Sequence, residues 1–371
     1  MGITIIPYTQ DWVPAVVAFN VRLQAGGMNV RFPETPTPAW LPRLPGRSLY
    51  QEYFLAVSGD AVRGAYILKS QEFVLRGDVV TVGNFQLPIS EGAVDKAFAA
   101  VGLQLLSDAL RRQPLLYSLG IGGSQEPLTR LLRAVGWSIS PVPFVARVHH
   151  PVRFLREITY LRKTSARRAL LDTLAISGLG AVGIRLGQAL ATRSRRLVRD
   201  VTAVRVSNFE TWADALWHDV NVQYSLAATR SSAVLNILYP AANQRFIILK
   251  ISVGQKPVGW AVLLATPLSE HRHFGKMKLG SIVDNLALPG YEAAVAAAAT
   301  DWLEQEDVDL IVSNQAYAKW VAAVKQRGYL QGPSNFLLAI SKALTERLAP
   351  LAQHWPGIHM NRGDGDGPIH L

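Results

Sequence analysis

The sequence contains no cysteine among its 371 residues. This absence excludes a disulfide, a thiolate metal site and a cysteine nucleophile, and it suits a reducing compartment. The chain also lacks an uninterrupted apolar run of the roughly 18 residues that a membrane-spanning helix needs. Its first residues, MGITIIPYTQDW, show no basic region followed by an apolar run, so they do not resemble a secretory signal. We therefore expect a cytoplasmic protein, with peripheral membrane attachment as an alternative.

Motifs of several common enzyme classes are missing as well. The sequence contains no Walker loop, nucleophile elbow or zincin helix, and GIGGSQEP lacks the glycine spacing of a dinucleotide fingerprint. The stretch HMNRGDGDGPIHL holds RGD and DGDG, but it lacks the further oxygen ligands and the distal glutamate of a calcium loop. His359, His370 and Asp364 could together bind a metal, yet we expect no metal cofactor and a turn-rich tail over residues 346–371.

Acidic residues are scarce relative to basic ones, since 27 Asp and Glu stand against 38 Lys and Arg, for a net charge of +11. The imbalance is concentrated in residues 151–200, the basic connector, where eleven Lys and Arg face Glu157, Asp172 and Asp200. Such a concentration favours a local anionic partner over a uniformly basic protein.

The connector also contains the apolar run ALLDTLAISGLGAVGIRLGQALAT. Three interpretations stay open: a solvated helix, a segment that packs between the two halves and receives an anionic substrate, and a segment in the interface of an anionic membrane. In the membrane interpretation, Arg193, Arg195 and Arg196 would approach the headgroups. RNA is a weaker alternative because the connector lacks the interleaved aromatic residues of a stacking surface.

The chain carries one sequence frame twice. GWSISPVPFVA at 136–146 and GYLQGPSNFLL at 328–338 both follow Gly, aromatic, three residues, Pro, two residues, Phe, aliphatic. Upstream of each copy lies an Asn-x-x-x-Pro frame, NFQLP at 84–88 and NLALP at 285–289, which ends a strand-like run. These landmarks occur in the same order in both halves, which favours an internal duplication.

The elements around these frames also correspond. Alanine-rich helices are predicted over about 93–110 and 291–306, each followed by an apolar strand and a second helix. Strand, turn and strand precede them, with Gly64 and Gly259 early in the second strand. At 49% hydrophobic, the chain has enough apolar material for two cores. We predict an α/β (α+β) fold of two mixed-sheet units, residues 1–150 and 201–345, joined by the connector.

This order of elements resembles the GNAT acyltransferase fold, here in tandem. The resemblance rests on VGWAVLL, IVDNLALPG, DLIVSNQ, AAVKQRGY and SNFLLAI, with weaker equivalents in the first half. It implies that acetyl-CoA or another acyl-CoA binds where two central strands splay, near the strand ending at Pro289 or Pro88. A helix N-terminus would then offer N–H groups to the pyrophosphate. The implied donor-binding residues are Leu286, Leu288, Gly290, Tyr291, Glu292 and Ala293 in the second half, and Ser90, Glu91 and Gly92 in the first.

The sequence departs from the family pattern in two places. Neither half has the Gln or Arg followed by spaced glycines that forms the usual phosphate loop. Val324 and Leu132 stand four residues before the Gly-aromatic pair, where many members carry a tyrosine that protonates the leaving thiolate. Neither side chain can transfer a proton, so catalysis would need another acid or solvent. Ser90 has a second interpretation, as a helix cap.

Three residues of the second half are candidates for catalysis. Asp284 lies on the strand expected to face the acceptor, where it could act as the base, while a structural carboxylate paired with Lys278 or another cation is the alternative. Asn314 could contact the cofactor or a water, or it could cap the next helix. Tyr317 could supply an acid, or it could pack. Gly83 stands at the place of Asp284 in the first half, so we expect the second unit to be the active one.

The resemblance therefore predicts an acyltransferase that moves an acyl group from acyl-CoA or a similar thioester to an amine or hydroxyl acceptor. The first unit would be a degenerate copy. The alternative is a non-catalytic protein that uses the duplicated fold as a binding or scaffolding surface, peripheral to a membrane through the connector.

Overall fold

A computed structural model describes residues 2–192 and 200–367. The contacts divide the chain into two compact units, Met1–Pro141 with Asn335–Trp355, and Val142–Ser334 with Pro356–Leu371. The predicted membrane-contact residues Arg193, Arg195 and Arg196 lie outside the described residues, as does His370.

The first unit is built on one mixed sheet with the strand order β1-β2-β3-β4-β5-β15-β6. Its strands are β1 (Thr4–Pro7), β2 (Tyr50–Ser58), β3 (Ala61–Leu75), β4 (Asp78–Ser90), β5 (Leu116–Leu119), β6 (Ser138–Pro141) and β15 (Leu337–Ile340). Its helices are α1 (Val13–Ala25), α2 (Val101–Arg112), α3 (Pro127–Ala134), α11 (Lys342–Arg347) and α12 (Leu351–His354).

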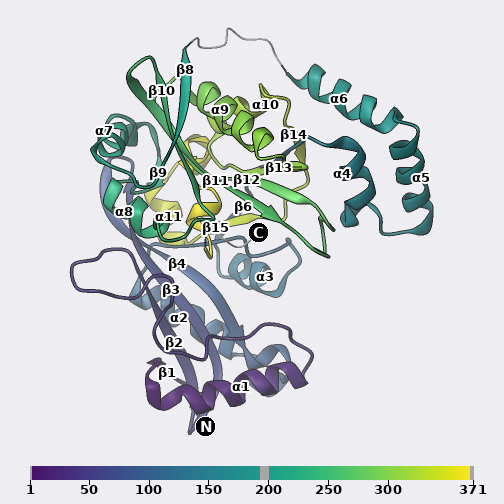
Figure 1. The fold of residues 1–371 in the computed structure, drawn as a ribbon. Coiled ribbons are helices and arrows are strands. Elements are labelled where there is room, and N and C mark those ends of the chain that lie inside the picture. Colours follow the sequence, from purple (N-terminus) through teal and green to yellow (C-terminus); the bar gives the residue numbers. More distant parts are fainter. Residues whose placement is uncertain (1, 193–199, 368–371) are drawn as a thin grey trace. The chain divides into compact units, whose positions relative to one another are not determined.

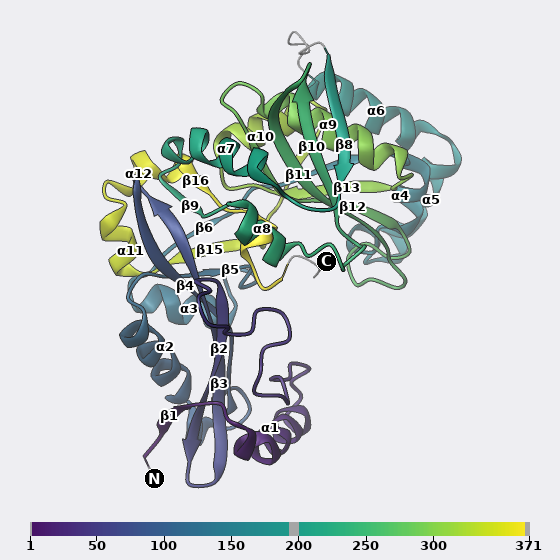
Figure 2. The ribbon, with the colours of Figure 1, turned by 60° about the vertical axis from the view of Figure 1, so that its left-hand side comes forward.

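Two apolar cores cover the two faces of this sheet. On one face, Phe19 and Leu23 of α1 pack against Leu55. On the other face, Leu105 of α2 packs in a core with Tyr66. Alternate residues of a strand point to opposite faces, so long apolar strands such as β3 can serve both cores. Figure 2 shows α1 and α2 on opposite sides of β2 and β3.

The second unit contains a second mixed sheet, with the strand order β14-β7-β13-β12-β11-β10-β8. Its strands are β7 (Phe144–Val148), β8 (Val201–Val206), β10 (Ile247–Val253), β11 (Lys256–Pro267), β12 (Lys278–Ala287), β13 (Leu310–Asn314) and β14 (Leu330–Gly332), and β9 (Leu226–Ala228) pairs in parallel with β16 (Ile358–His359). Its helices are α4 (Pro151–Glu157), α5 (Ser165–Ile176), α6 (Leu179–Ala191), α7 (Thr211–Val220), α8 (Ser232–Leu238), α9 (Glu292–Gln305) and α10 (Ala318–Lys325).

The described part of the connector belongs to this second unit. Ile158, just after α4, joins Leu279 and Leu310 of the sheet in one apolar core, and α5 and α6 follow α4 at the side of the sheet (Figure 1). The sequence predicted a separate connector over residues 151–200 and a unit that starts at residue 201. In the structure the second unit already starts at Val142 and includes the described part of the connector.

The two units exchange a strand. β7 lies between β13 and β14 in the second sheet, although the sequence repeat predicted that it closes the first unit. β15 lies between β5 and β6 in the first sheet, although it was expected to close the second unit. The predicted boundaries 1–150 and 201–345 are therefore corrected: each Gly-aromatic frame begins with a strand of its own unit and ends with a strand of the other.

The two repeated glycines have the same structural role. A Cβ atom on Gly64 would lie 2.6 Å from a methyl group of Val101 in α2, and one on Gly259 would lie 2.6 Å from a methyl group of Val295 in α9. Real side chains cannot approach so closely, because such contacts lie far inside van der Waals distance. In each unit, the glycine lets the helix after the central strand pack directly on the neighbouring strand.

Candidate functional site

The central strands of the second unit part at the position implied by the resemblance. β12 and β13 pair in parallel from Leu279 with Leu310 to Ile282 with Ser313. β12 continues to Ala287 along its other neighbour, β11. The backbone of β12 after Ile282 is therefore unpaired on its β13 side, which opens the kind of gap that admits a ligand between parallel strands.

A segment from the end of the chain occupies this gap. Asn361 forms an isolated antiparallel bridge with Gln315, the residue after β13. The amide of Ala316 donates to the carbonyl of Met360 over 2.9 Å. On the other side, the side chain of Asn361 donates to Asp284 of β12 over 2.7 Å. We call Ile358–Asp364 the tail plug, because it contacts both strands of the splay.

Asp284 is the centre of a buried charge network. Nε and Nη2 of Arg230 each lie 3.2 Å from its Oδ1, and Nη2 of Arg230 also lies 2.9 Å from Oδ2 of Asp364 in the tail plug. The hydroxyl of Tyr239 donates to Oδ2 of Asp284 over 2.8 Å. Arg230, Asp284 and Asp364 are all at least 98% buried, since their side chains are at most 2% exposed.

This environment bears on the predicted role of Asp284 as a base. Burial raises the pKa of Asp284, the Arg230 guanidinium opposes that shift, and the Asp364 carboxylate adds to it. Both carboxylate oxygens already accept hydrogen bonds from Arg230, Asn361 and Tyr239. A general base must reach the proton it removes, so a fully engaged carboxylate is suited to holding the tail plug. The cation that pairs with Asp284 is Arg230, not Lys278.

Asn314 and Tyr317 also have local partners. Oδ1 of Asn314 accepts a bond from Nε of Arg362 over 3.2 Å, so Asn314 binds the tail plug. It does not cap the next helix, because Tyr317 is the N-cap residue of α10. Tyr317 is 4% exposed and packs edge-on against Tyr224, with 5.0 Å between ring centroids. Its environment fits a packing role.

Three of the six implied donor-binding residues of the second unit use their amides internally. The amide of Leu288 donates to Val258, that of Tyr291 donates to Leu288, and that of Gly290 donates to the carboxylate of Glu292 over 2.8 Å. Glu292 is the first residue of α9 and is buried. Its negative charge lies where the helix dipole would attract a pyrophosphate. Leu286 is fully buried, while Ala293, the second residue of α9, is partly exposed.

In the first unit, the structure corrects the predicted place of Ser90, Glu91 and Gly92. Ser90 ends β4, and Glu91 and Gly92 lie in a separate 3-10 turn, Glu91–Ala93, while α2 begins only at Val101 rather than near residue 93. Ser90 caps that turn by accepting from the amide of Gly92, as its alternative interpretation predicted. The three residues are therefore not at the N-terminus of α2.

Glu91 has a structural environment of its own. Arg22 and Arg63 bind its carboxylate at 2.7 and 3.0 Å. Hydrogen bonds from both arginines lower the pKa of Glu91 against the opposing effect of burial. The carboxylate thus ties α1 and β3 to the turn after β4.

The splay between β4 and β5 of the first unit differs from the splay of the second unit in the residues that surround it. β4 and β5 pair in parallel only at Gly83 with Leu116 and Asn84 with Tyr117, while β4 continues to Ser90. The following helix, α2, has no acidic residue in its first turn, and its N-cap residue Ala100 forms no side-chain cap. A Cβ atom on Gly102, the second residue of α2, would have no heavy atom closer than 3.9 Å. The first turn of α2 therefore has room for a Cβ atom at Gly102 and has no side-chain anion of its own.

A row of buried polar residues crosses the first sheet beside this splay. Gln51, Lys69 and Asn84 are register partners on β2, β3 and β4. Gln71 and Gln86 lie two residues further along and share the face, and the amide of Gln51 donates to Gln86 over 2.8 Å. All five are buried, and Lys69 has no exposed surface. Buried lysines are rare unless they have a partner or a function, and Nζ of Lys69 lies over the ring of Trp40, 5.5 Å from its centroid.

Sequence reasoning missed this row. The signal was present in two pairs of long polar side chains, each two residues apart inside a largely apolar strand: Lys69 with Gln71, and Asn84 with Gln86. A polar residue at every second position of a buried strand lies on one face. Recognising the row required the pairing of β2, β3 and β4.

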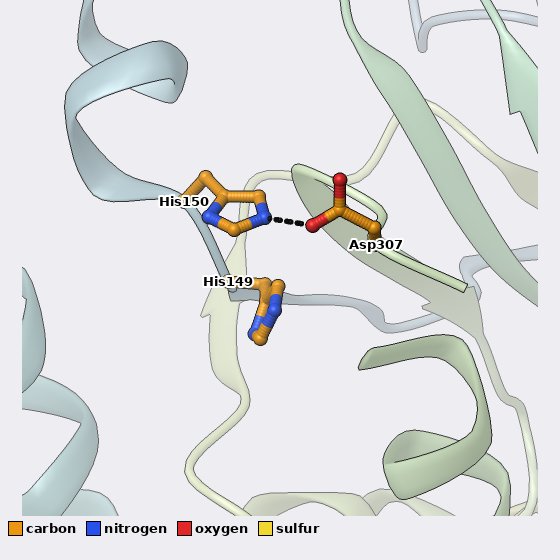
Figure 3. A group of neighbouring side chains, drawn as sticks. All are labelled: His149, His150 and Asp307. Carbon is orange, nitrogen blue, oxygen red and sulfur yellow. Dashed lines mark hydrogen bonds and ion pairs between the residues drawn. The ribbon is translucent and has the colours of Figure 1, made fainter. Parts of the chain in front are cut away.

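One group of possible metal ligands lies elsewhere in the second unit. His149 and His150 follow β7, and Asp307 lies between α9 and β13 (Figure 3). Nε2 of His150 is 2.7 Å from Oδ1 of Asp307, and this hydrogen bond lowers the pKa of Asp307. The ligand atoms of the three residues lie within 4.8 Å of one another. The hydrogen bond satisfies His150 and Asp307 without an ion.

The chain was compared with known proteins. No family model matches it, and no curated protein matches it in sequence. Among solved structures, a conserved protein of unknown function from Enterococcus faecalis, described as a probable N-acyltransferase, aligns with 94% of this chain and 74% of its own at a TM-score of 0.51 and 10% identity.

Two further structures are similar. A GCN5-related N-acetyltransferase from Anabaena variabilis aligns with 91% of this chain and 72% of its own, at a TM-score of 0.51 and 9% identity. A tandem GNAT protein from the clavulanic acid biosynthesis pathway aligns with 92% of this chain and 98% of its own, at a TM-score of 0.48 and 10% identity. The chain has the GNAT fold, built as two mixed-sheet units.

Proposed function

We propose that this protein is an acyltransferase that moves an acyl group from acyl-CoA or a similar thioester to an amine or hydroxyl acceptor. We further propose that the first unit binds the donor, although the sequence favoured the second. The observation that carries this proposal is the contrast between the two splays. In the first unit, the first turn of α2 has no acidic side chain, and β4 beyond Asn84 does not pair with β5. In the second unit, the tail plug and Glu292 occupy the corresponding places.

Acyl transfer requires a donor site and an acceptor site, one on each side of the splay. The donor needs N–H groups and a positive helix end for its pyrophosphate, which α2 supplies at Val101 and Gly102. The acceptor needs polar groups that hold its nucleophile near the thioester carbonyl. The buried row with Lys69 and Asn84 lies on the face of the sheet opposite α2, and Asn84 belongs to β4, the strand that borders the splay. We assign the acceptor side to this row.

The donor site can be tested by placing the same charge at matched positions of the two helices. Gly102→Asp and Ala293→Asp each add a carboxylate at the second residue of a helix, α2 or α9. A negative charge there favours the helix itself, so both variants should fold. Because like charges about 4 Å apart repel by roughly 1–4 kcal/mol near a protein surface, Gly102→Asp should weaken coenzyme A binding at least about fivefold. Ala293→Asp should leave it within about twofold.

The measurement is isothermal titration of the full chain with coenzyme A, acetyl-CoA and a long-chain acyl-CoA, with thermal unfolding as the control for folding. Weakening by Ala293→Asp alone would move the donor to the second unit and overturn our assignment. Binding of none of these ligands by the wild-type chain would refute the acyltransferase proposal and leave the non-catalytic scaffold.

A further inference from the structure

The helices α5 and α6 expose their apolar side chains to solvent. The exposed residues are Leu170, Ile176, Leu179, Val182, Leu186 and Leu190, whose exposed fractions run from 55% to 85%. Ala175 is the only buried residue of α5, and Gln188 is the only buried residue of α6. Contiguous exposed apolar surface of this kind marks an interaction site.

The helix α6 presents an apolar stripe to solvent. At about 100° per residue, Leu179, Val182, Leu186 and Leu190 fall within a stripe roughly 80° wide, and Gln188 falls on the opposite side. Leu190 is 85% exposed, whereas Gln188 is 6% exposed. The side toward the protein also holds the apolar residues Ala181 and Ile184, both partly buried. The helix α6 is therefore apolar on both sides and only the inner side is covered, whereas a surface helix in water normally keeps a polar outer face. The stripe therefore requires a partner that is apolar.

The surface around the stripe is basic. Residues 151–192 contain seven Lys and Arg against two acidic residues, Glu157 and Asp172. Asp172 is neutralised by Arg162, which binds it at 2.8 and 3.0 Å. Arg167 and Arg185 are exposed. The partner must therefore combine an apolar layer with negative charge.

We propose that α5 and α6 dock on an anionic lipid membrane, with the stripe in the acyl boundary and the basic side chains at the headgroups. This arrangement is typical of interfacial helices, which combine an apolar face with Lys and Arg. No single described helix is long and apolar enough to cross a bilayer, although α5 and α6 together pass such a test with an 82° bend between them. Their 12 and 13 residues span only about 20 Å each, against a hydrocarbon core of about 30 Å. The pair therefore lies along the surface.

The test is co-sedimentation of the full chain with phosphatidylcholine vesicles that contain or lack 30% phosphatidylglycerol. The wild-type chain should bind the anionic vesicles and bind the neutral ones at least tenfold more weakly. Leu179→Ser, Leu186→Ser and Leu190→Ser combined should reduce binding at least about tenfold, because each removes apolar surface from the acyl boundary. Arg167→Gln and Arg185→Gln should each reduce it roughly fivefold, the factor for about 1 kcal/mol per basic residue.

The matched control changes three apolar residues that are equally exposed but lie outside the stripe: Val79→Ser, Val204→Ser and Val222→Ser, with exposed fractions of 65%, 58% and 76%. It should bind as the wild-type chain does. Equal binding to neutral and anionic vesicles, no binding at all, or a stripe variant that binds like the control would each overturn the proposal. The alternative partner of the stripe is a second copy of the chain, which sedimentation velocity without lipid tests. If the stripe variant dissociates an oligomer and leaves lipid binding unchanged, a second copy covers this face and the membrane proposal is wrong.

Discussion

Replacing Arg230 by Met should be among the most damaging single changes in the second unit. The guanidinium pairs with both Asp284 and Asp364, and both carboxylates are at least 98% buried. Methionine removes the buried counter-ion that the two carboxylates share. Breaking a buried pair in this way costs about 3–5 kcal/mol, which is a large part of the total stability of a typical domain, about 5–15 kcal/mol.

Two other variants show whether the cost of Arg230→Met comes from the loss of charge balance. Asp364→Asn keeps one cation opposite one carboxylate, so it should cost only about 1.5–3 kcal/mol, the range for a lost hydrogen bond to a charged group. Arg347→Met removes an exposed pair with Asp78, whose side chain is 75% exposed, and should cost less than about 1 kcal/mol. Urea unfolding followed by circular dichroism measures all three. A cost for Arg230→Met no larger than that for Asp364→Asn would refute the reasoning that charge balance governs the network.

Two further predictions concern single groups. Burial and the nearby Arg230 hold the pKa of His359 well below its usual value. As the pH falls through about 6.5, His359 is therefore protonated in the unfolded chain but stays neutral in the folded chain. This contribution to stability is present above pH 6.5 and is lost as the pH falls, by about 1.4 kcal/mol at pH 5.5. His359→Phe should remove that part of the pH dependence of urea unfolding, and an unchanged slope would contradict the account. Lys69→Met should lower kcat/KM about ten- to hundredfold, the effect of losing a hydrogen bond to a charged group, with coenzyme A affinity within twofold. Loss of stability without loss of activity would instead make Lys69 structural.

The sequence by itself determined the elements and the duplication. Local periodicity predicted the alanine-rich helix that became α9, because neighbouring turns of one helix must share a face. The repeated glycines Gly64 and Gly259 marked the same place in both halves, where strand and helix meet. The order of these elements led to the GNAT fold, which the solved structures share.

Only the tertiary structure decided which strand pairs with which and what Asp284 does. β7 and β15 have the same local pattern, and a strand's pattern states which face is apolar but not which sheet receives its edge. Arg230 lies 54 residues before Asp284 and 134 residues before Asp364. Local sequence patterns cannot predict that these three residues pair, because they are far apart in the chain. Their burial becomes favourable only when the folded chain brings the opposite charges together.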